Sequence, residues 1–305
     1  MRRNERVPPG ERTGAKTTRA WGKGAAIPAR AVDRGPYSGA MTETQSTPQS
    51  EHTVRRAAVV TGASSGIGRA TALRLAVEGW TVFAVARRAA RLQDLTDEAA
   101  GTPGRIVALP ADVTSAREMS WVRDQVAENG GADTVLCIAG GALGTDRVSE
   151  GGLDDWDWMF RVNVQGTLNT VQALLPMLRE TGRGTVLVLT STAALASYEG
   201  GGGYNAAKMA EHGLVGALRL EEAEHNVRVV EVLPGMVHTE EFTRNRLRGD
   251  QAAADSVYTG VEKPLTAEDV ADICTYAVSV PHHVNLDQIV MRPVAQAAQF
   301  KLIRK

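Results

Sequence analysis

The sequence predicts a doubly wound α/β fold: one domain built on a seven-stranded parallel sheet with helices on both faces. From about Arg56 onward, short runs rich in Val, Ile and Leu alternate with segments of helical character. Strands that are apolar at every position, instead of every second one, are typical of sheets covered on both faces. Strands separated by helices predict right-handed crossovers, and ligands of such folds bind beyond the carboxyl ends of the strands.

The expected elements follow one another along the chain from this point. Apolar β-type runs predict strands over residues 57–62, 81–86, 105–113, 132–140, 184–191, 227–235 and 286–293. Helices are expected over 68–79, 88–100 and 153–181, and a further helix carries Tyr204.

Composition and charge place the chain among ordinary globular proteins. Of its 305 residues 43% are hydrophobic and 23% charged, and its net charge is −1, which favours neither a nucleic-acid partner nor an anionic membrane. No apolar run approaches the ~20 residues that span a bilayer. Cys137 and Cys274 lie in an expected strand and an expected helix, so we interpret them as buried thiols of a cytoplasmic protein rather than a disulfide or a thiol catalyst.

Residues 1–54 differ from the rest, and we expect a disordered extension before a catalytic domain at 55–305. The segment holds nine Lys or Arg, five Asp or Glu and five Pro, with almost no hydrophobic periodicity. Such a segment cannot bury enough apolar surface to offset its chain entropy. It lacks the apolar stretch of a secretory signal, and Glu5, Glu11 and Asp33 argue against a transit peptide. The alternative to a disordered extension is that translation of the protein starts at Met41 and that residues 1–40 are not part of it.

A glycine-rich loop follows the first expected strand, in the run "TGASSGIG". Small residues let backbone amides approach a phosphate, whose charge then lies at the N-terminus of the next helix. A glycine loop alone also fits a plain turn, but its place between a strand and a helix favours a dinucleotide site. The residues expected to hold the pyrophosphate are Gly62, Ser64, Ser65, Gly66, Ile67 and Gly68.

The end of the second strand favours NADP over NAD. NAD sites of this fold place an acid there, whereas this chain has Ala86 followed by Arg87 and Arg88. A guanidinium can bind a 2′-phosphate through two hydrogen bonds. The alternative, that an arginine only solvates the next helix, fits Arg91 better than Arg87. Asp112 and Val113 end the third strand and are expected to border the adenine.

Taken together, the motifs resemble those of the short-chain dehydrogenase/reductase family over about residues 56–299. They are, in chain order, "TGASSGIG", "ADV", "VNVQG", "LTSTA", "YNAAK" and "PGMVHT". The resemblance implies a Rossmann-type fold that moves hydride between a nicotinamide cofactor and a substrate carbon, interconverting a hydroxyl and a carbonyl group. It also implies cofactor contacts from Ala139, Gly140, Pro234, Gly235, Val237 and Thr239.

The same resemblance assigns four catalytic residues. Tyr204 is the acid/base, Lys208 assists it and binds the nicotinamide ribose, Ser191 holds the substrate oxygen, and Asn163 holds a water that links Lys208 to solvent. Tyr204 and Lys208 lie four residues apart and share one helix face, so the ammonium is expected to lower the pKa of the phenol. Without the other motifs, such residues fit a solvated helix and a cap equally well. Thr192 is the weaker candidate for the role of Ser191.

One motif departs from the family pattern. Where the family has Asn-Asn-Ala-Gly after the fourth strand, this chain has Cys137 and Ile138 before Ala139 and Gly140. The two asparagines normally pin neighbouring strands by hydrogen bonds, so their loss is expected to affect stability or the placement of the cofactor.

The resemblance also implies that the segment after "PGMVHT" forms a mobile lid over the substrate. Its sequence resembles the NADP-dependent branch that acts on 3-hydroxy acids and serine, and Arg246 matches the basic position of that branch. We therefore expect Arg246 to bind a substrate carboxylate. The alternative is that Arg244, Arg246 and Arg248 are all solvated lid charges. Glycines 200–203 are expected to form a flexible border of the substrate cavity.

Other functions remain open at this stage. The substrate could be a bulkier ketone or a 3-oxoacyl thioester, or the chain could be a regulatory protein that binds NADP without turnover. The resemblance implies a homo-oligomer, a tetramer or a dimer. His282 and His283 adjoin one another in an expected loop, but no further ligands cluster nearby in the sequence, so no metal site is expected.

Overall fold

The computed structural model of the chain describes residues 56–305. The predicted disorder of residues 1–54 therefore lies outside the described residues.

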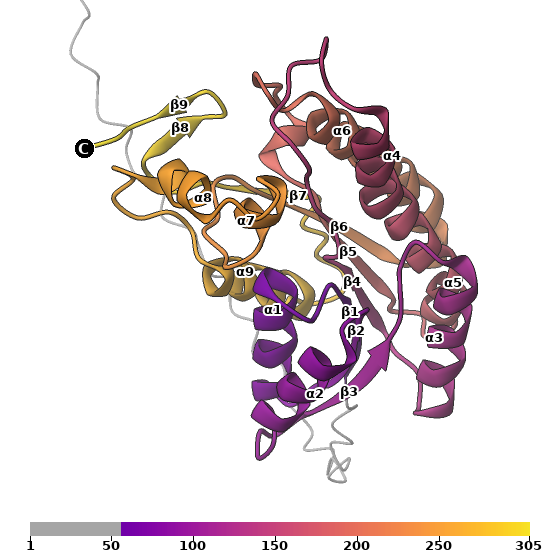
Figure 1. The fold of residues 1–305 in the computed structure, drawn as a ribbon. Coiled ribbons are helices and arrows are strands. Elements are labelled where there is room, and N and C mark those ends of the chain that lie inside the picture. The colour runs from indigo at the N-terminus through magenta and orange to yellow at the C-terminus, as the bar shows by residue number, and fades with distance from the viewer. Residues whose placement is uncertain (1–55) are drawn as a thin grey trace, which may run out of the picture. The chain divides into compact units, whose positions relative to one another are not determined.

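A single seven-stranded parallel sheet forms the centre of the fold (Figure 1), as predicted. Its order is β3-β2-β1-β4-β5-β6-β7, so the direction of winding reverses between β1 and β4. The strands are β1 (Ala57–Thr61), β2 (Thr81–Ala86), β3 (Arg105–Pro110), β4 (Thr134–Cys137), β5 (Thr185–Leu189), β6 (Arg228–Pro234) and β7 (Gln288–Met291). A crevice at such a reversal is the usual ligand site of open α/β sheets.

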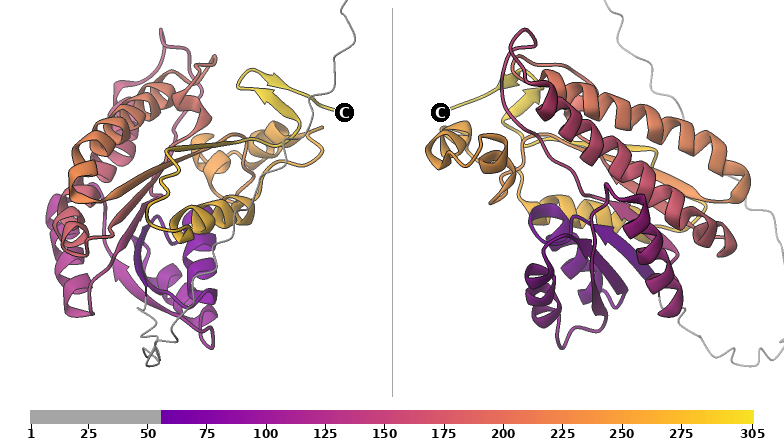
Figure 2. Two further views of the ribbon diagram at one scale, coloured as in Figure 1. Left: turned by 180° about the vertical axis from the view of Figure 1, so that it is seen from behind. Right: turned by 45° about the vertical axis from the view of Figure 1, so that its right-hand side comes forward.

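Helices cover both faces of the sheet, which explains why most positions of its inner strands are apolar. Figures 1 and 2 show α1 (Gly66–Val77), α2 (Ala89–Glu98) and α9 (Ala267–Ser279) on one face. The other face carries α3 (Ala116–Glu128), α4 (Leu153–Phe160), α5 (Gly166–Glu180) and α6 (Gly202–Glu222). Within β1, Val60 packs into the core under the first group and Val59 into the core under the second.

The predicted helix over 153–181 contains a π turn that the sequence pattern did not indicate. Arg161–Gln165 forms this turn between α4 and α5. Inside it, the Asn163 side chain is fully buried, and its Nδ2 donates to the carbonyl oxygen of Met159 at 2.7 Å. A side chain that bonds the backbone of its own helix in this way competes with the regular ladder. The π turn thus lies at a predicted site residue.

Four short elements lie beyond the carboxyl ends of the strands, two of them between β6 and α9 and two after β7. They are α7 (Phe242–Arg246), α8 (Gln251–Tyr258), β8 (Gln296–Ala298) and β9 (Lys301–Leu302). Strands β8 and β9 pair antiparallel, apart from the main sheet (Figure 1). Across residues 56–305, no helix combines the length and apolarity needed to cross a bilayer.

Candidate active site

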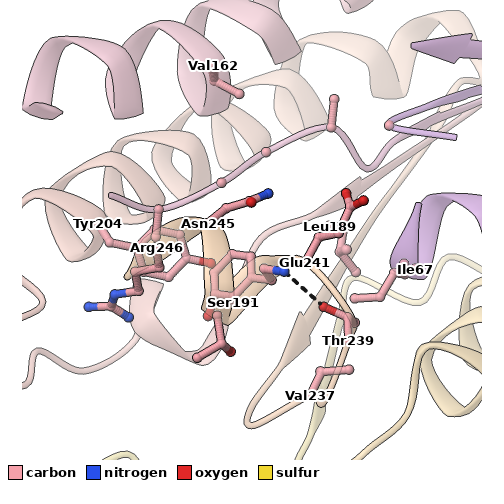
Figure 3. A pocket seen from close by; sticks show the side chains of 18 of the residues that line it. Ile67, Val162, Leu189, Ser191, Tyr204, Val237, Thr239, Glu241, Asn245 and Arg246 are labelled. Carbon is pink, nitrogen blue, oxygen red and sulfur yellow. Dashed lines mark hydrogen bonds between the residues drawn. The ribbon is translucent and has the colours of Figure 1, made fainter. Parts of the chain in front are cut away.

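A cleft of about 810 Å³ opens at the carboxyl end of the sheet, where the winding reverses. It brings together every predicted cofactor residue, from the glycine loop to Thr239, and also Ser191, Tyr204, Lys208 and Arg246. Asn163 alone among the predicted site residues does not line it. Figure 3 shows Tyr204, Ser191 and Arg246 toward one side of the cleft and Ile67, Val237 and Thr239 toward the other.

The glycine loop is shaped for a close backbone approach. Gly62 has φ +70°, and a Cβ there would lie 2.9 Å from the Cα of Ala139. A Cβ on Gly68 would collide with the carbonyl oxygen of Gly62 and lie 3.0 Å from that of Thr61. Helix α1 begins at Gly66, so its free amides face the cleft. A pyrophosphate fits this cradle of amides because nothing larger than hydrogen projects from its glycines.

The Thr61 hydroxyl joins the end of β1 to the segment that follows β4. It accepts hydrogen bonds from the amides of Ile138 and Ala139, each at 3.0 Å. Cys137 and Ile138 are buried and pack into the two cores. Strands β1 and β4 are therefore joined at their carboxyl ends without either asparagine.

The two arginines after β2 have different surroundings. The Arg88 guanidinium donates to both carboxylate oxygens of Glu241 at 2.9 Å, and its Nη2 donates to the hydroxyls of Ser64 and Ser65 at 2.9 Å. Hydrogen bonds from Arg88 hold the pKa of Glu241 below its usual range. Arg87 is 67% exposed and lies 4.0 Å from Asp112. Arg87 is thus the more accessible cation at this end of the cleft.

Tyr204 and Lys208 lie on one face of α6, as predicted, and both side chains are buried. Lys208 acts on the Tyr204 pKa in the predicted direction, but the predicted net decrease of this pKa is wrong. Burial raises the pKa of this phenol, and the Lys208 ammonium opposes that effect without overcoming it. Since only 9% of Tyr204 is exposed, the cost of placing a phenolate in this environment outweighs one neighbouring charge. The phenol is therefore protonated at neutral pH, the form that can donate a proton.

Ser191 follows β5 at the floor of the cleft. Its Oγ accepts a hydrogen bond from the amide of Ala193 at 3.1 Å and lies 3.5 Å from the carbonyl oxygen of Pro234. Thr192 also lines the cleft, with a buried hydroxyl that has no hydrogen-bond partner among the described residues. Ser191 thus retains a weakly held hydroxyl on the same side of the cleft as Tyr204.

Asn163 lies behind the cleft wall and holds the loop that follows β4. Its Nδ2 donates to the carbonyl oxygen of Gly141 at 2.9 Å, and its Oδ1 accepts from the Gly141 amide at 3.1 Å. A Cβ on Gly140 would lie 2.6 Å from this Oδ1 and 3.4 Å from the Nζ of Lys208. The side chain is therefore close to Lys208 but is occupied by backbone partners, and its role toward a water stays a prediction.

Arg246, at the end of α7, reaches the cleft beside Tyr204. It donates to the carbonyl oxygens of Gly144 and Gly200 at 3.1 and 2.9 Å and to the Tyr198 hydroxyl at 2.8 Å. Its guanidinium carbon lies 5.8 Å from the centre of the Tyr204 ring. Of Arg244, Arg246 and Arg248, only Arg246 lines the cleft.

The four glycines at 200–203 serve packing more than flexibility. Gly200 has φ +69° and lines the cleft, which agrees with the expected border. A Cβ on Gly203 would collide with Cε of Met159, and one on Gly202 would lie 2.9 Å from Val148. Gly202 and Gly203 are the first residues of α6 and Gly201 is its N-cap, so the approach to the helix is closely packed and not unobstructed as expected.

Two carboxylates that the sequence did not indicate belong to the site. Glu241 binds Arg88, which is 153 positions away in the chain. Glu211 accepts a hydrogen bond from the Nζ of Lys208 at 2.6 Å. Glu211 follows Lys208 by three positions, and this spacing could have indicated the ion pair, because residues three apart share a helix face. No local pattern links Glu241 to Arg88.

Comparisons with known proteins agree with this geometry. A profile of the short chain dehydrogenase family matches residues 56–249. An oxidoreductase of Mycobacterium tuberculosis is 46% identical over 246 residues, which cover 81% of this chain and 94% of the relative. Sulfoacetaldehyde reductase 2 of Chromohalobacter salexigens is 37% identical over 241 residues, which cover 78% of this chain and 94% of the relative. The closed form of a serine dehydrogenase complexed with NADP+ has 31% identity and a TM-score of 0.75, covering 82% of this chain and 99% of that one.

Proposed function

Because this chain belongs to the short-chain dehydrogenase family, an oxidoreductase family, we propose that it reduces a small carbonyl substrate bearing an anionic group, with NADPH as hydride donor, or catalyses the reverse oxidation. The observation that carries the substrate class is the position of Arg246. It is a cation beside Tyr204 in the cleft where the reaction takes place. A 3-hydroxy acid fits this arrangement better than a bulky neutral ketone or an acyl thioester.

NADP is proposed as the cofactor on the charges at the end of β2. Ala86 stands where a carboxylate would repel a 2′-phosphate, and the exposed Arg87 lines the same part of the cleft. The NADP+ complex of the related serine dehydrogenase supports this choice. The pyrophosphate is assigned to the loop from Gly62 to Gly68, and the nicotinamide ribose to Tyr204 and Lys208.

Each residue of the proposed mechanism has a defined task. When bound, the nicotinamide supplies hydride at its C4 to the substrate carbonyl carbon. Tyr204 donates its phenolic proton to the substrate oxygen, which becomes the product hydroxyl. Ser191 donates a hydrogen bond to the same oxygen as charge develops on it. Lys208 provides the positive charge that the phenolate needs after the proton has left.

An anionic substrate is also suggested by two relatives. Sulfoacetaldehyde carries a sulfonate and serine a carboxylate, and the reductase and dehydrogenase named for them share 37% and 31% of aligned residues with this chain. A guanidinium can bind either anion through two hydrogen bonds. We also propose that the protein is cytoplasmic and acts as a homo-oligomer, a dimer or a tetramer.

Arg246→Ala tests the proposed substrate class. The kcat/KM for a small 3-oxo acid is expected to fall by about tenfold to a hundredfold, the value of one charged hydrogen-bonded contact. The kcat/KM for the neutral methyl ester of the same acid should change much less, because no charge is lost. NADPH oxidation measured with both substrates gives these values.

Arg244→Ala is the matched control, because Arg244 lies on the same helix, is exposed and does not line the cleft. This variant should leave kcat/KM unchanged for both the 3-oxo acid and its methyl ester. An equal loss for acid and ester in Arg246→Ala would show that Arg246 only supports the loops at Gly144 and Gly200, and would contradict the proposed role.

A further inference from the structure

A buried carboxylate pairs with the lysine of the active site. Glu211 lies on α6 three residues after Lys208 and is 0% exposed. Its Oε2 accepts from the Nζ of Lys208 at 2.6 Å, and its Oε1 accepts from the Thr167 hydroxyl at 2.7 Å. Lys208 also donates to the carbonyl oxygen of Leu189 at 3.1 Å. The pair therefore bridges α6, α5 and the end of β5.

The other titratable groups around this pair do not replace Glu211 as a partner. Tyr204 on α6 is neutral in the ground state. Burial raises the pKa of the Cys137 thiol on β4, and the Glu211 charge raises it further, so this group is neutral as well. Glu231 on β6 interacts with Thr190 at 2.6 Å and with His212 at 2.9 Å. Among the described residues, Lys208 forms its only salt bridge with Glu211.

A buried ammonium with no counter-charge tends to lose its proton, because the charged form is poorly solvated in the interior. Burial acts to lower the pKa of Lys208, but the Glu211 carboxylate outweighs it, and the pKa is raised. Burial also raises the pKa of Glu211, and the Lys208 ammonium opposes that effect. The short contact at 2.6 Å also fixes where the ammonium lies. Thr167 in turn fixes the carboxylate.

We propose that Glu211 is a positioning residue that keeps the Lys208 ammonium charged and in place beside Tyr204, a role that rests on the proposed function of this site. Glu211 would touch neither substrate nor cofactor and would act entirely through Lys208. The role differs from that of a merely structural ion pair, because it predicts a change in the protonation of a second residue.

The test is a titration of Lys208 followed by NMR in protein labelled with carbon-13 at the lysine Cε. The chain has six lysines, and comparison with Lys208→Met assigns the signal of Lys208. In the wild type, Lys208 should titrate above the ordinary lysine range. In Glu211→Gln, which keeps the shape of the side chain and removes its charge, Lys208 should titrate lower than in the wild type by about one pH unit or more.

Glu222→Gln is the matched control. Glu222 lies on the same helix, is 1% exposed and pairs with Arg179, so the variant also removes a buried carboxylate from an ion pair of α6. It is expected to lower thermal stability and to leave the titration of Lys208 unchanged. Identical titration of Lys208 in Glu211→Gln and the wild type would overturn the proposal.

The titration of wild-type Lys208 tests the proposed role of Glu211 even if the Glu211→Gln variant does not fold. If Lys208 of the wild type titrates at or below the ordinary lysine range, Glu211 does not hold its charge and the proposal fails. Thr167→Val keeps the Glu211 carboxylate and removes only the hydrogen bond that orients it. In this variant the pH at which Lys208 titrates is therefore expected to decrease by less than in Glu211→Gln.

Activity gives a second readout that separates this inference from the proposed function. The charged form of Lys208 exists below its pKa, so carbonyl reduction by Glu211→Gln should decline with rising pH at a lower pH than in the wild type. A wild type that oxidises NADPH with none of the substrates would refute the proposed function. The NMR titration would still test the pairing of Glu211 with Lys208.

Discussion

Tyr204→Phe is expected to lower kcat for carbonyl reduction by about 10²–10⁴-fold, the usual contribution of one positioned proton donor. The change removes only the hydroxyl, and the ring keeps its edge contact with Phe242 at a centroid distance of 5.9 Å. The melting temperature should therefore change little, and the Kd for NADPH should rise by less than about tenfold, the value of the one hydrogen bond to the ribose that is lost. Steady-state NADPH oxidation, a fluorescence titration with NADPH and a thermal melt measure the three quantities.

Tyr198→Phe is the control for this experiment, because Tyr198 also lines the cleft and bonds Arg246 at 2.8 Å but lies outside the proposed proton transfer. Its kcat is expected to fall by less than about tenfold, as for the loss of one hydrogen bond. A Tyr204→Phe variant that keeps the wild-type kcat would remove Tyr204 from the mechanism.

The pH dependence of the wild type follows from the same group. Burial raises the pKa of Tyr204, so the protonated phenol needed for reduction persists through neutral pH and is lost only as pH rises toward that pKa. Alcohol oxidation needs the phenolate and should increase with pH over the same range. The two directions of the reaction are thus expected to have opposite alkaline slopes.

Gly68→Ala is expected to lower the free energy of unfolding by about 3 kcal/mol, since it adds a methyl group to a packed contact. The new Cβ would collide with the carbonyl oxygen of Gly62, so α1 and the loop would have to separate. Because this loop is the proposed phosphate cradle, the Kd for NADPH should rise by about tenfold or more. Urea unfolding and a fluorescence titration measure both effects.

The same substitution at Gly213 is the matched control. Gly213 lies inside α6, is exposed, and a Cβ there would have no heavy atom within 4 Å. Replacing an exposed helical glycine by alanine is expected to stabilise the protein by about 1 kcal/mol. NADPH binding should not change. Equal effects at Gly68 and Gly213 would show that the close contact in the loop does not matter.

The sheet could be predicted from the sequence because a short run of apolar residues marks each of its strands. A strand buried on both faces is mostly apolar, as in Thr185–Leu189, where every residue is buried and four of the five are Val or Leu. Helix α3 was not among the predicted elements, although Ser115 caps it by accepting from the amide of Glu118 at 3.2 Å. The π turn at Arg161–Gln165 could not be predicted from the pattern of the segment, and its buried residue Asn163 bonds the distant backbone of Gly141.

The site divides in the same way between local and tertiary causes. The glycine loop, Ser191, Tyr204 and Lys208 belong to short motifs with fixed spacing, and the fold brings them into one cleft. The predicted net decrease of the Tyr204 pKa was wrong because this pKa depends on burial by α7 and the neighbouring loops, which spacing does not show. Glu241 was missed because its partner Arg88 belongs to a distant part of the chain.

The central claim is that hydride leaves NADPH for a small anionic carbonyl substrate in this cleft. The most direct measurement uses NADPH deuterated at the nicotinamide C4, a 3-oxo acid or an aldehyde acid, and mass spectrometry of the product. Deuterium is predicted on the new carbinol carbon, with faster transfer from NADPH than from equally labelled NADH. If NADPH binds but its deuterium reaches none of the tested 3-oxo acids, ketones and acyl thioesters, the claim is contradicted.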